Sequence, residues 1–276
     1  MPFAGIDIGS TMTKVVIIDR DGIIVSSVIG PTGAEHRHLA LEVMDEAIKK
    51  AGLTFEQLDF IVSTGYGRIN VPFNDKQITE ITCHSRSIRE LFPSARILID
   101  IGGQDSKGIK LDSDGKVKNF VMNDKCAAGT GRFLEVIAEA LGIELTQMGE
   151  LSLKAKKVVK ISNTCTVFAE HEVTTRLTEG STIPEIVAGL HEAFATRVVN
   201  MVRSLGIEKD VVVTGGGAKN IGLVKAVEDK VGFPVLVPPE PLLTGALGAA
   251  LLGRDSVARG VTRERERRLE GVTFFK

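Results

Sequence analysis

The sequence lacks residues that several common classes of binding protein need. It has no tryptophan and a single tyrosine, Tyr66, so few aromatic side chains are available for stacking on nucleic-acid bases. Its formal net charge is −1, so no basic excess favours a nucleic acid or a membrane surface. No apolar run reaches the ~18 residues of a membrane span, and the N-terminus does not have the pattern of a signal peptide. We therefore expect a cytoplasmic protein that binds neither nucleic acid nor membrane.

Cysteine is also scarce, with Cys83, Cys126 and Cys165 as its only occurrences. An odd, small number of cysteines argues against a disulfide framework. Burial, catalysis and metal binding remain open for these thiols.

The 276 residues are enough to form two lobes with cores of their own. Ile- and Val-rich segments separated by short turns predict strands, and the opening pattern of three strands starts again 93 residues later, where Asp100 corresponds to Asp7. The two sets are 3–9, 13–19 and 23–29, then 96–101, 107–112 and 116–122. We interpret them as an internal duplication.

The remaining segments predict helices alternating with single strands. The expected helices are 34–51, 80–92, 129–142, 146–154, 166–179, 184–206, 218–231 and 243–253, and the expected strands are 58–63, 211–214 and 234–237. The predicted organisation is an N-terminal lobe over 1–94, a C-terminal lobe over 95–253 and a charged tail over 254–276.

Two turns of the duplicated pattern have matching polar residues. Asp7–Lys14, the first hairpin, and Asp100–Lys107, the second hairpin, each place a carboxylate at a strand end, followed by glycine and then hydroxyls or amides. Glycines let backbone N–H groups approach phosphate oxygens, and the two acids can hold Mg²⁺ through water. The candidate ligands of nucleotide are Gly9, Ser10, Thr11, Lys14, Gly102, Gly103 and Gln104.

The second hairpin has two further candidates for chemistry. Either Gln104 or Asp105 could orient an attacking water. Together with the two acids that can hold Mg²⁺, the predicted catalytic residues are Asp7, Asp100, Gln104 and Asp105. The alternative for Gln104 is a hydrogen bond within the turn alone.

A third glycine-rich element, Thr214–Asn220, lies between a Val-rich strand and a helix, and we name it the triglycine loop. Three glycines in a row let a ring or a phosphate lie against bare backbone beside a helix N-terminus. The candidate adenosine contacts are Gly215, Gly216, Gly217, Lys219 and Asn220.

Cys126 and Cys165 each come just before a predicted helix. Two cysteines cannot form a four-thiolate site within one chain, but a two-fold dimer would bring four together, which is the number that a [4Fe–4S] cluster takes. From the residues alone, burial as small hydrophobes or zinc binding are alternatives.

The order of the three glycine-rich elements resembles the superfamily of actin, hexokinase, acetate kinase and Hsp70. That resemblance implies an α/β, actin-like (ribonuclease H-like) duplicated two-lobe ATPase fold that binds ATP or ADP with Mg²⁺ between its lobes.

The segments DIGSTMTK, DIGGQDSK, NDKCAAGTGRF, NTCTVFAE and TGGGAKN together closely resemble the ATP-dependent activators of 2-hydroxyacyl-CoA dehydratases and the ATPase subunits of benzoyl-CoA reductase. The resemblance implies a homodimer or pseudo-symmetric heterodimer with one [4Fe–4S] cluster shared between two subunits through Cys126 and Cys165. It also implies electron transfer to an iron–sulfur acyl-CoA dehydratase or reductase, with ferredoxin or flavodoxin as the donor.

Two other functions fit the same fold. A small-molecule kinase acting on a sugar or a carboxylate would use Asp100 or Asp105 as a base, but it would have no use for the paired cysteines. A non-enzymatic nucleotide-switched binding protein would need a peptide-binding domain, which we do not find in the sequence.

Overall fold

The computed structural model describes residues 1–33, 36–162 and 165–263. The chain forms two compact units. Unit 1 comprises Met1–Pro93, Ser113–Val117 and Leu242–Lys276, and unit 2 comprises Ser94–Asp112 and Lys118–Pro241.

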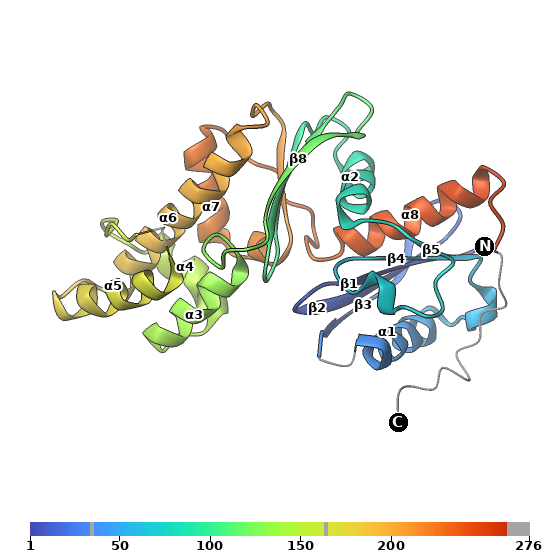
Figure 1. The fold of residues 1–276 in the computed structure, drawn as a ribbon, viewed down its shortest axis with the longest axis horizontal. Helices are drawn as coiled ribbons and strands as arrows, with labels where there is room; N and C mark the ends of the chain where they lie inside the picture. Colours follow the sequence, from blue (N-terminus) through green and yellow to red (C-terminus); the bar gives the residue numbers. More distant parts are fainter. Residues whose placement is uncertain (34–35, 163–164, 264–276) are drawn as a thin grey trace. The chain divides into compact units, whose positions relative to one another are not determined.

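Unit 1 contains a five-stranded sheet in the order β3-β2-β1-β4-β5 (Figure 1). The strands are β1 (Phe3–Ile8), β2 (Met12–Ile18), β3 (Ile24–Pro31), β4 (Phe60–Thr64) and β5 (Lys76–Gln77). β1 pairs antiparallel with β2 and parallel with β4. Because parallel strands have their carboxyl ends at one edge, the residues after β1 and β4 meet there.

The helices of unit 1 are α1 (His36–Ala51), α2 (Glu80–Leu91) and α8 (Thr244–Ala258). Side chains of a strand alternate between the two faces of its sheet. Ile6 and Ile8 therefore pack in one apolar cluster with α1, whereas Phe3 packs with α8 in another.

Unit 2 contains a four-stranded sheet in the order β8-β7-β6-β9. The strands are β6 (Ile97–Ile101), β7 (Ser106–Leu111), β8 (Val117–Asn123) and β9 (Val211–Thr214). The helices are α3 (Gly131–Leu141), α4 (Met148–Leu153), α5 (Thr166–Thr178), α6 (Ile183–Arg203) and α7 (Ile221–Val231). Ile97, Ile99 and Ile101 pack on apolar residues of these helices, with Phe194 of α6 among them. Short 3₁₀ turns are η1 (Phe55–Gln57), η2 (Arg68–Asn70), η3 (Leu145–Gln147) and η4 (Gly216–Lys219).

The pairing confirms the duplicated strand pattern. β6 pairs antiparallel with β7 and parallel with β9, as β1 does with β2 and β4. In each unit, the turn of the hairpin thus lies beside the carboxyl end of the parallel neighbour strand.

Some boundaries differ from the sequence-based expectation. The segment 234–237 forms only an isolated bridge between Leu236 and Val212, and the expected helix 218–231 is divided into η4 and α7 at Asn220. Although α8 follows unit 2 in the chain, its apolar residues pack on β1 and β4 of unit 1, and the helix continues to Ala258. Most of the predicted charged tail, 264–276, lies outside the described residues.

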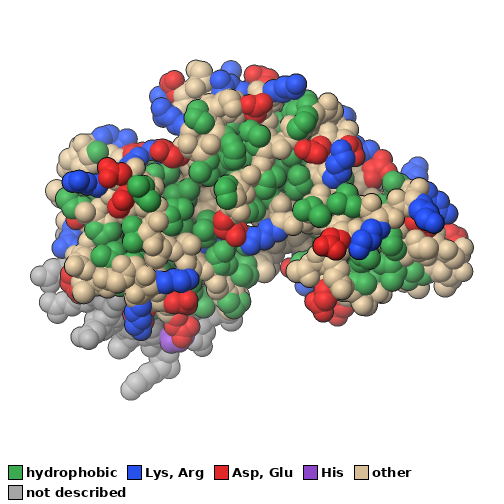
Figure 2. Space-filling model, turned by 180° about the vertical axis from the view of Figure 1, so that it is seen from behind, with side chains coloured by type: hydrophobic (Ala, Val, Ile, Leu, Met, Phe, Trp, Pro, Cys, Tyr) green, Lys and Arg blue, Asp and Glu red, His purple; other side chains and the backbone are tan. Residues whose placement is uncertain are grey.

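On the face in Figure 2, basic and acidic side chains are interspersed with hydrophobic ones. Among the described helices, none combines the length and apolarity that crossing a membrane requires.

Candidate functional site

The first hairpin joins β1 to β2 in unit 1. The strand register places Asp7 opposite Lys14, and Lys14 Nζ lies 3.2 Å from Asp7 Oδ2 with both side chains buried. The Gly9 N–H donates to the Met12 carbonyl at 3.1 Å and closes the turn. The ammonium group of Lys14 therefore offsets the cost of burying the Asp7 carboxylate.

Ser10 and Thr11 form the rim of this turn. Thr11 is exposed and Ser10 is half-buried. Their hydroxyls and backbone N–H groups can reach a phosphate without disturbing the buried ion pair below.

The second hairpin repeats this geometry between β6 and β7. Asp100 lies opposite Lys107, and the Gly102 N–H donates to the Asp105 carbonyl at 2.9 Å. Gly103 is half-buried and Gln104 is exposed at the tip, so the Gln104 amide is available to a ligand or a water.

Asp105 is the main chemical difference between the hairpins, since it occupies the turn position of Met12. Lys107 Nζ lies 2.6 Å from Asp105 Oδ2 but 3.8 Å from Asp100 Oδ2. The Asp105 side chain is 33% exposed, whereas that of Asp100 is 6% exposed. The second hairpin therefore has an accessible carboxylate in addition to the buried one.

The triglycine loop touches the second hairpin at its base. Thr214 Oγ1 donates to Asp100 Oδ1 at 2.8 Å. Gly215 has φ +79°, and a Cβ there would collide with the Ile101 carbonyl. Only glycine allows this backbone to pass so close to Asp100, so unit 2 brings together two of the predicted nucleotide elements.

The side chains at the end of the triglycine loop already have protein partners. Lys219 Nζ pairs with the Glu240 carboxylate at 3.0 Å. Asn220 Oδ1 accepts the Leu223 N–H and caps α7, while Asn220 Nδ2 lies 3.0 Å from His191 Nε2. The Asn220 side chain thus serves the loop structure, which leaves backbone and glycine surface for a ligand.

The sequence analysis did not anticipate His191. It lies on α6, 1% exposed, and no described residue is a hydrogen-bond partner of its Nδ1. Burial lowers its pKa to about 4, so the ring is neutral and Nε2 can accept the Asn220 N–H. In the sequence, the burial of His191 is indicated by its place beside Leu190 on the apolar face of the predicted helix.

Cys126 lies in the segment Asp124–Thr130 that leads from β8 into α3, and we name it the cysteine segment. The helix begins at Gly131, two residues later than the predicted start at 129, and Thr130 is its N-cap. The Asn123 amide donates to the carbonyls of Cys126 and Ala128. These two hydrogen bonds hold the backbone of the cysteine segment against the end of β8.

The second hairpin is bonded directly to this segment and to the start of α3. Ser106 Oγ donates to the Gly129 carbonyl at 2.6 Å. The N–H groups of Gly131 and Arg132 donate to the Gly102 and Gly103 carbonyls, both at 2.8 Å. A helix N-terminus needs acceptors for its first N–H groups, and here the turn of the hairpin supplies them.

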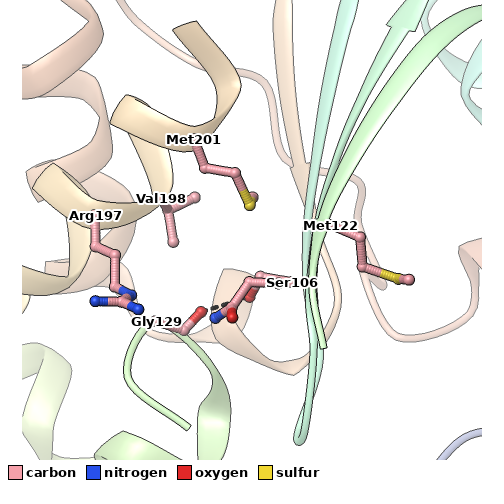
Figure 3. A pocket seen from close by; sticks show the side chains of 7 residues that line it. Ser106, Met122, Gly129, Arg197, Val198 and Met201 are labelled. Atoms are coloured by element: carbon pink, nitrogen blue, oxygen red, sulfur yellow. Dashed lines mark hydrogen bonds between the residues drawn. The ribbon is translucent and has the colours of Figure 1, made fainter. Parts of the chain in front are cut away.

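A pocket of about 250 Å³ lies next to the hydrogen bond between Ser106 and Gly129, and both residues line it. In Figure 3, Arg197, Val198 and Met201 of α6 lie across from the hydrogen-bonded pair Ser106 and Gly129. Its lining residues are Ser106, Met122, Asn123, Gly129, Arg197, Val198 and Met201.

The three cysteines have different surroundings. Cys126 and Cys165 are half-buried free thiols in unit 2, and Cys165 is the N-cap of α5, which packs on α3. Cys83 is buried in unit 1, where burial raises the pKa of its thiol to about 12. Within the described ranges, no three His, Cys, Asp or Glu side chains gather as a metal site. Because the sequence has three cysteines, a cluster with four thiolates would need cysteines from a second chain.

Three comparisons extend this description. Residues 4–253 match the model of the BadF/BadG/BcrA/BcrD ATPase family. The chain is 48% identical over 257 residues to the activator of lactoyl-CoA dehydratase from Anaerotignum propionicum, covering 92% of this chain and 98% of that protein.

The fold matches solved structures as well. The activator of the 2-hydroxyisocaproyl-CoA dehydratase from Clostridium difficile with bound ADPNP has a TM-score of 0.89 at 43% identity, covering 96% of this chain and 100% of that one. A ROK family glucokinase from Streptomyces griseus, with a TM-score of 0.57 at 12% identity over 92% of this chain and 100% of that one, shares the fold alone. The predicted actin-like fold is confirmed, and the chain belongs to the BadF/BadG/BcrA/BcrD ATPase family.

Proposed function

We propose that this protein is an ATP-hydrolysing activator that passes one low-potential electron to an iron–sulfur acyl-CoA dehydratase or reductase. The family and the names of its relatives support an ATP-dependent activating role. The observation that carries the proposal is the set of hydrogen bonds that joins the second hairpin to the cysteine segment and α3.

The hairpins would bind ATP or ADP with Mg²⁺. Asp7 and Asp100 would hold water molecules of the Mg²⁺ ion, which keeps several of them when bound to protein. Backbone N–H groups of both turns, with Ser10 and Thr11, would contact phosphate oxygens. Asp105 or Gln104, both accessible on the second hairpin, would orient the attacking water.

The triglycine loop would hold the adenosine part of the nucleotide. Its exposed position, Gly216, presents bare backbone between two buried glycines. His191 and Asn220 would fix the loop from behind through their hydrogen bond.

Hydrolysis would act on the cysteine segment through the second hairpin. A shift of the turn when the terminal phosphate leaves would move the carbonyls of Gly102 and Gly103, and these accept from the start of α3. The same hairpin is also bonded to the cysteine segment, through the hydrogen bond from Ser106 to the Gly129 carbonyl. Movement of the hairpin would therefore be passed to the segment that contains Cys126.

Cys126 and Cys165 fit a [4Fe–4S] cluster shared by two copies of the chain. The cluster would supply one-electron transfer at low potential. Both thiols are partly accessible, and next to Cys165 the side chains of Val167 and Phe168 are 69% and 68% exposed. Such apolar exposure is typical of an interface that another chain covers.

The proposed assembly is a cytoplasmic homodimer. Reduced ferredoxin or flavodoxin would be oxidised as it supplies the electron, and the iron–sulfur centre of the partner enzyme would be reduced. A pseudo-symmetric heterodimer with a similar chain would provide the same four thiolates.

Iron and acid-labile sulfide in protein purified without oxygen test this proposal. We expect about four of each per dimer, lost in Cys126→Ser and in Cys165→Ser. The matched control is Cys83→Ser, which should keep its iron because Cys83 is fully buried in unit 1.

ATP binding, measured by calorimetry, should persist in all three variants. Metal-free wild-type protein that still hydrolyses ATP would contradict the electron-transfer role.

A further inference from the structure

The segment Thr64–Asn70, which we name the TGYG loop, has the same pattern as the triglycine loop. It reads Thr-Gly-Tyr-Gly-Arg-Ile-Asn, and Thr214–Asn220 reads Thr-Gly-Gly-Gly-Ala-Lys-Asn. Both follow the parallel neighbour of the hairpin strand, since β4 ends at Thr64 and β9 ends at Thr214.

The backbone hydrogen bonds of the two loops also correspond. In the TGYG loop, the N–H of Arg68 donates to the Gly65 carbonyl and that of Asn70 to the Gly67 carbonyl. In the triglycine loop, the N–H groups of Ala218 and Asn220 donate to the carbonyls of Gly215 and Gly217. Each loop also contains a 3₁₀ turn, which starts after Gly67 in the TGYG loop and at Gly216, within the glycines, in the triglycine loop.

The contacts with the hairpin strands correspond in the same way. Gly65 has φ +85°, and a Cβ on it would collide with Asp7 Oδ1 and the Ile8 carbonyl. Gly215, at φ +79°, meets Ile101 and Asp100 in the equivalent manner. Asp7 pairs with Thr64 and Asp100 with Thr214 in the parallel registers. The duplication thus includes the loop as well as the hairpin.

One position differs in chemistry. In both loops the residue between the two buried glycines is exposed, and it is Tyr66 in one and Gly216 in the other. Tyr66 is 79% exposed, although its neighbours are anchored, with Gly65 against Asp7 and the Gly67 N–H on the Ile8 carbonyl at 2.9 Å. A large aromatic side chain is therefore held in solvent next to the phosphate-binding turn of the first hairpin.

We propose that the TGYG loop is the unit 1 counterpart of the triglycine loop, and that Tyr66 contacts the phosphate end of the bound nucleotide through its hydroxyl. The inference rests on the proposed nucleotide binding. Ile8, which accepts the Gly67 N–H, is the residue before Gly9, so the loop lies beside the phosphate turn. A phenol can donate to a phosphate oxygen or to a water on Mg²⁺. A contact of this kind distinguishes a triphosphate from a diphosphate.

The composition provides a direct probe. Because the chain has no tryptophan and Tyr66 is its only tyrosine, the tyrosine emission of the protein reports on this residue alone. We expect the emission to change when a non-hydrolysable ATP analogue with Mg²⁺ is added to the purified full-length protein, and to change less with ADP.

Calorimetry of Tyr66→Phe gives the second measurement. Losing a hydrogen bond to a charged group should raise the Kd of the ATP analogue about tenfold, with little change for ADP. Ile69→Ala, in the same loop and 68% exposed in the wild type, is the matched control and should bind both nucleotides as the wild type does.

The outcomes separate two failures. Wild-type protein that binds no nucleotide by calorimetry would overturn the proposed function itself. Wild-type protein that binds the analogue, with unchanged tyrosine emission and with unchanged affinity in Tyr66→Phe, would overturn only the assignment of Tyr66.

Discussion

The two hairpins share one backbone but differ in what surrounds them. In the first, Lys14 pairs with the buried Asp7, and the turn position opposite the glycine is the apolar Met12. In the second, Asp105 takes that position. Its Oδ2 lies 2.6 Å from Lys107 Nζ, and its side chain is partly exposed. The second turn also supplies acceptors to the N-terminus of α3. The duplicated hairpin thus has an extra carboxylate and a link to the cysteine segment in one copy only.

This difference suggests separate roles for the two copies. The first hairpin, with the TGYG loop, would bind and sense phosphate. The second would position the attacking water and transmit the result to Cys126. Asp105→Asn and Ser106→Ala test this division, and a pH measurement on His191 tests the structure that supports unit 2; the change with the largest expected effect comes first.

Asp105→Asn should lower the kcat of ATP hydrolysis by about 10²- to 10⁴-fold, the range for a lost proton-accepting group. The affinity for ATP should not fall, because the substitution removes a negative charge near the phosphates. Steady-state hydrolysis and calorimetry measure the two effects. Met12→Ala changes the equivalent position of the first hairpin and should leave kcat nearly unchanged. Equal losses in the two variants would show that Asp105 has no special role.

Acid should weaken unit 2 through His191. Its folded-state pKa of about 4 lies below the ordinary value of 6.5, so between these values the unfolded chain binds a proton that the folded chain does not. Stability should therefore fall by about 3 kcal/mol as the pH drops from 6.5 to 4. Urea unfolding across this range measures the slope.

His191→Gln keeps a hydrogen-bonding group toward Asn220 and should flatten the pH slope. His38→Gln, at an exposed position on α1 in unit 1, serves as the control and should leave the slope as it is. A slope that survives in His191→Gln would assign the acid sensitivity to other groups.

Ser106→Ala removes one bond between the second hairpin and the cysteine segment. The direct cost should be about 1 kcal/mol of stability. In iron-free protein with Cys165→Ser, the alkylation rate of Cys126 should differ between the ATP analogue and ADP, and Ser106→Ala should reduce that difference. Thr13→Val removes the corresponding hydroxyl of the first hairpin, which bonds Thr32 instead. If both substitutions reduce the difference in alkylation rate equally, the hydrogen bond of Ser106 does not connect the nucleotide site to Cys126.

Much of the architecture could be predicted because it depends on local patterns. The repeated strand, glycine turn and strand around Asp7 and Asp100 predicted the duplication, and the apolar faces predicted α1 and α6 within a few residues. The placement of α8 in unit 1 could not be predicted from its neighbours in the chain. It depends on which sheet its small apolar residues cover, and that is a long-range packing choice.

The sequence by itself determined which groups are predicted to do chemistry: two aspartate-containing glycine turns, a triglycine loop and two cysteines proposed for a shared site. Those are matters of residue type and spacing along a strand or turn. Only the tertiary structure decided how these groups are connected. It buried His191 under Asn220, set Asp105 against Lys107 and joined Gly102 and Gly103 to α3. These contacts bring together residues distant in the chain, and they form because buried polar groups and helix ends must find partners wherever the packed fold provides them.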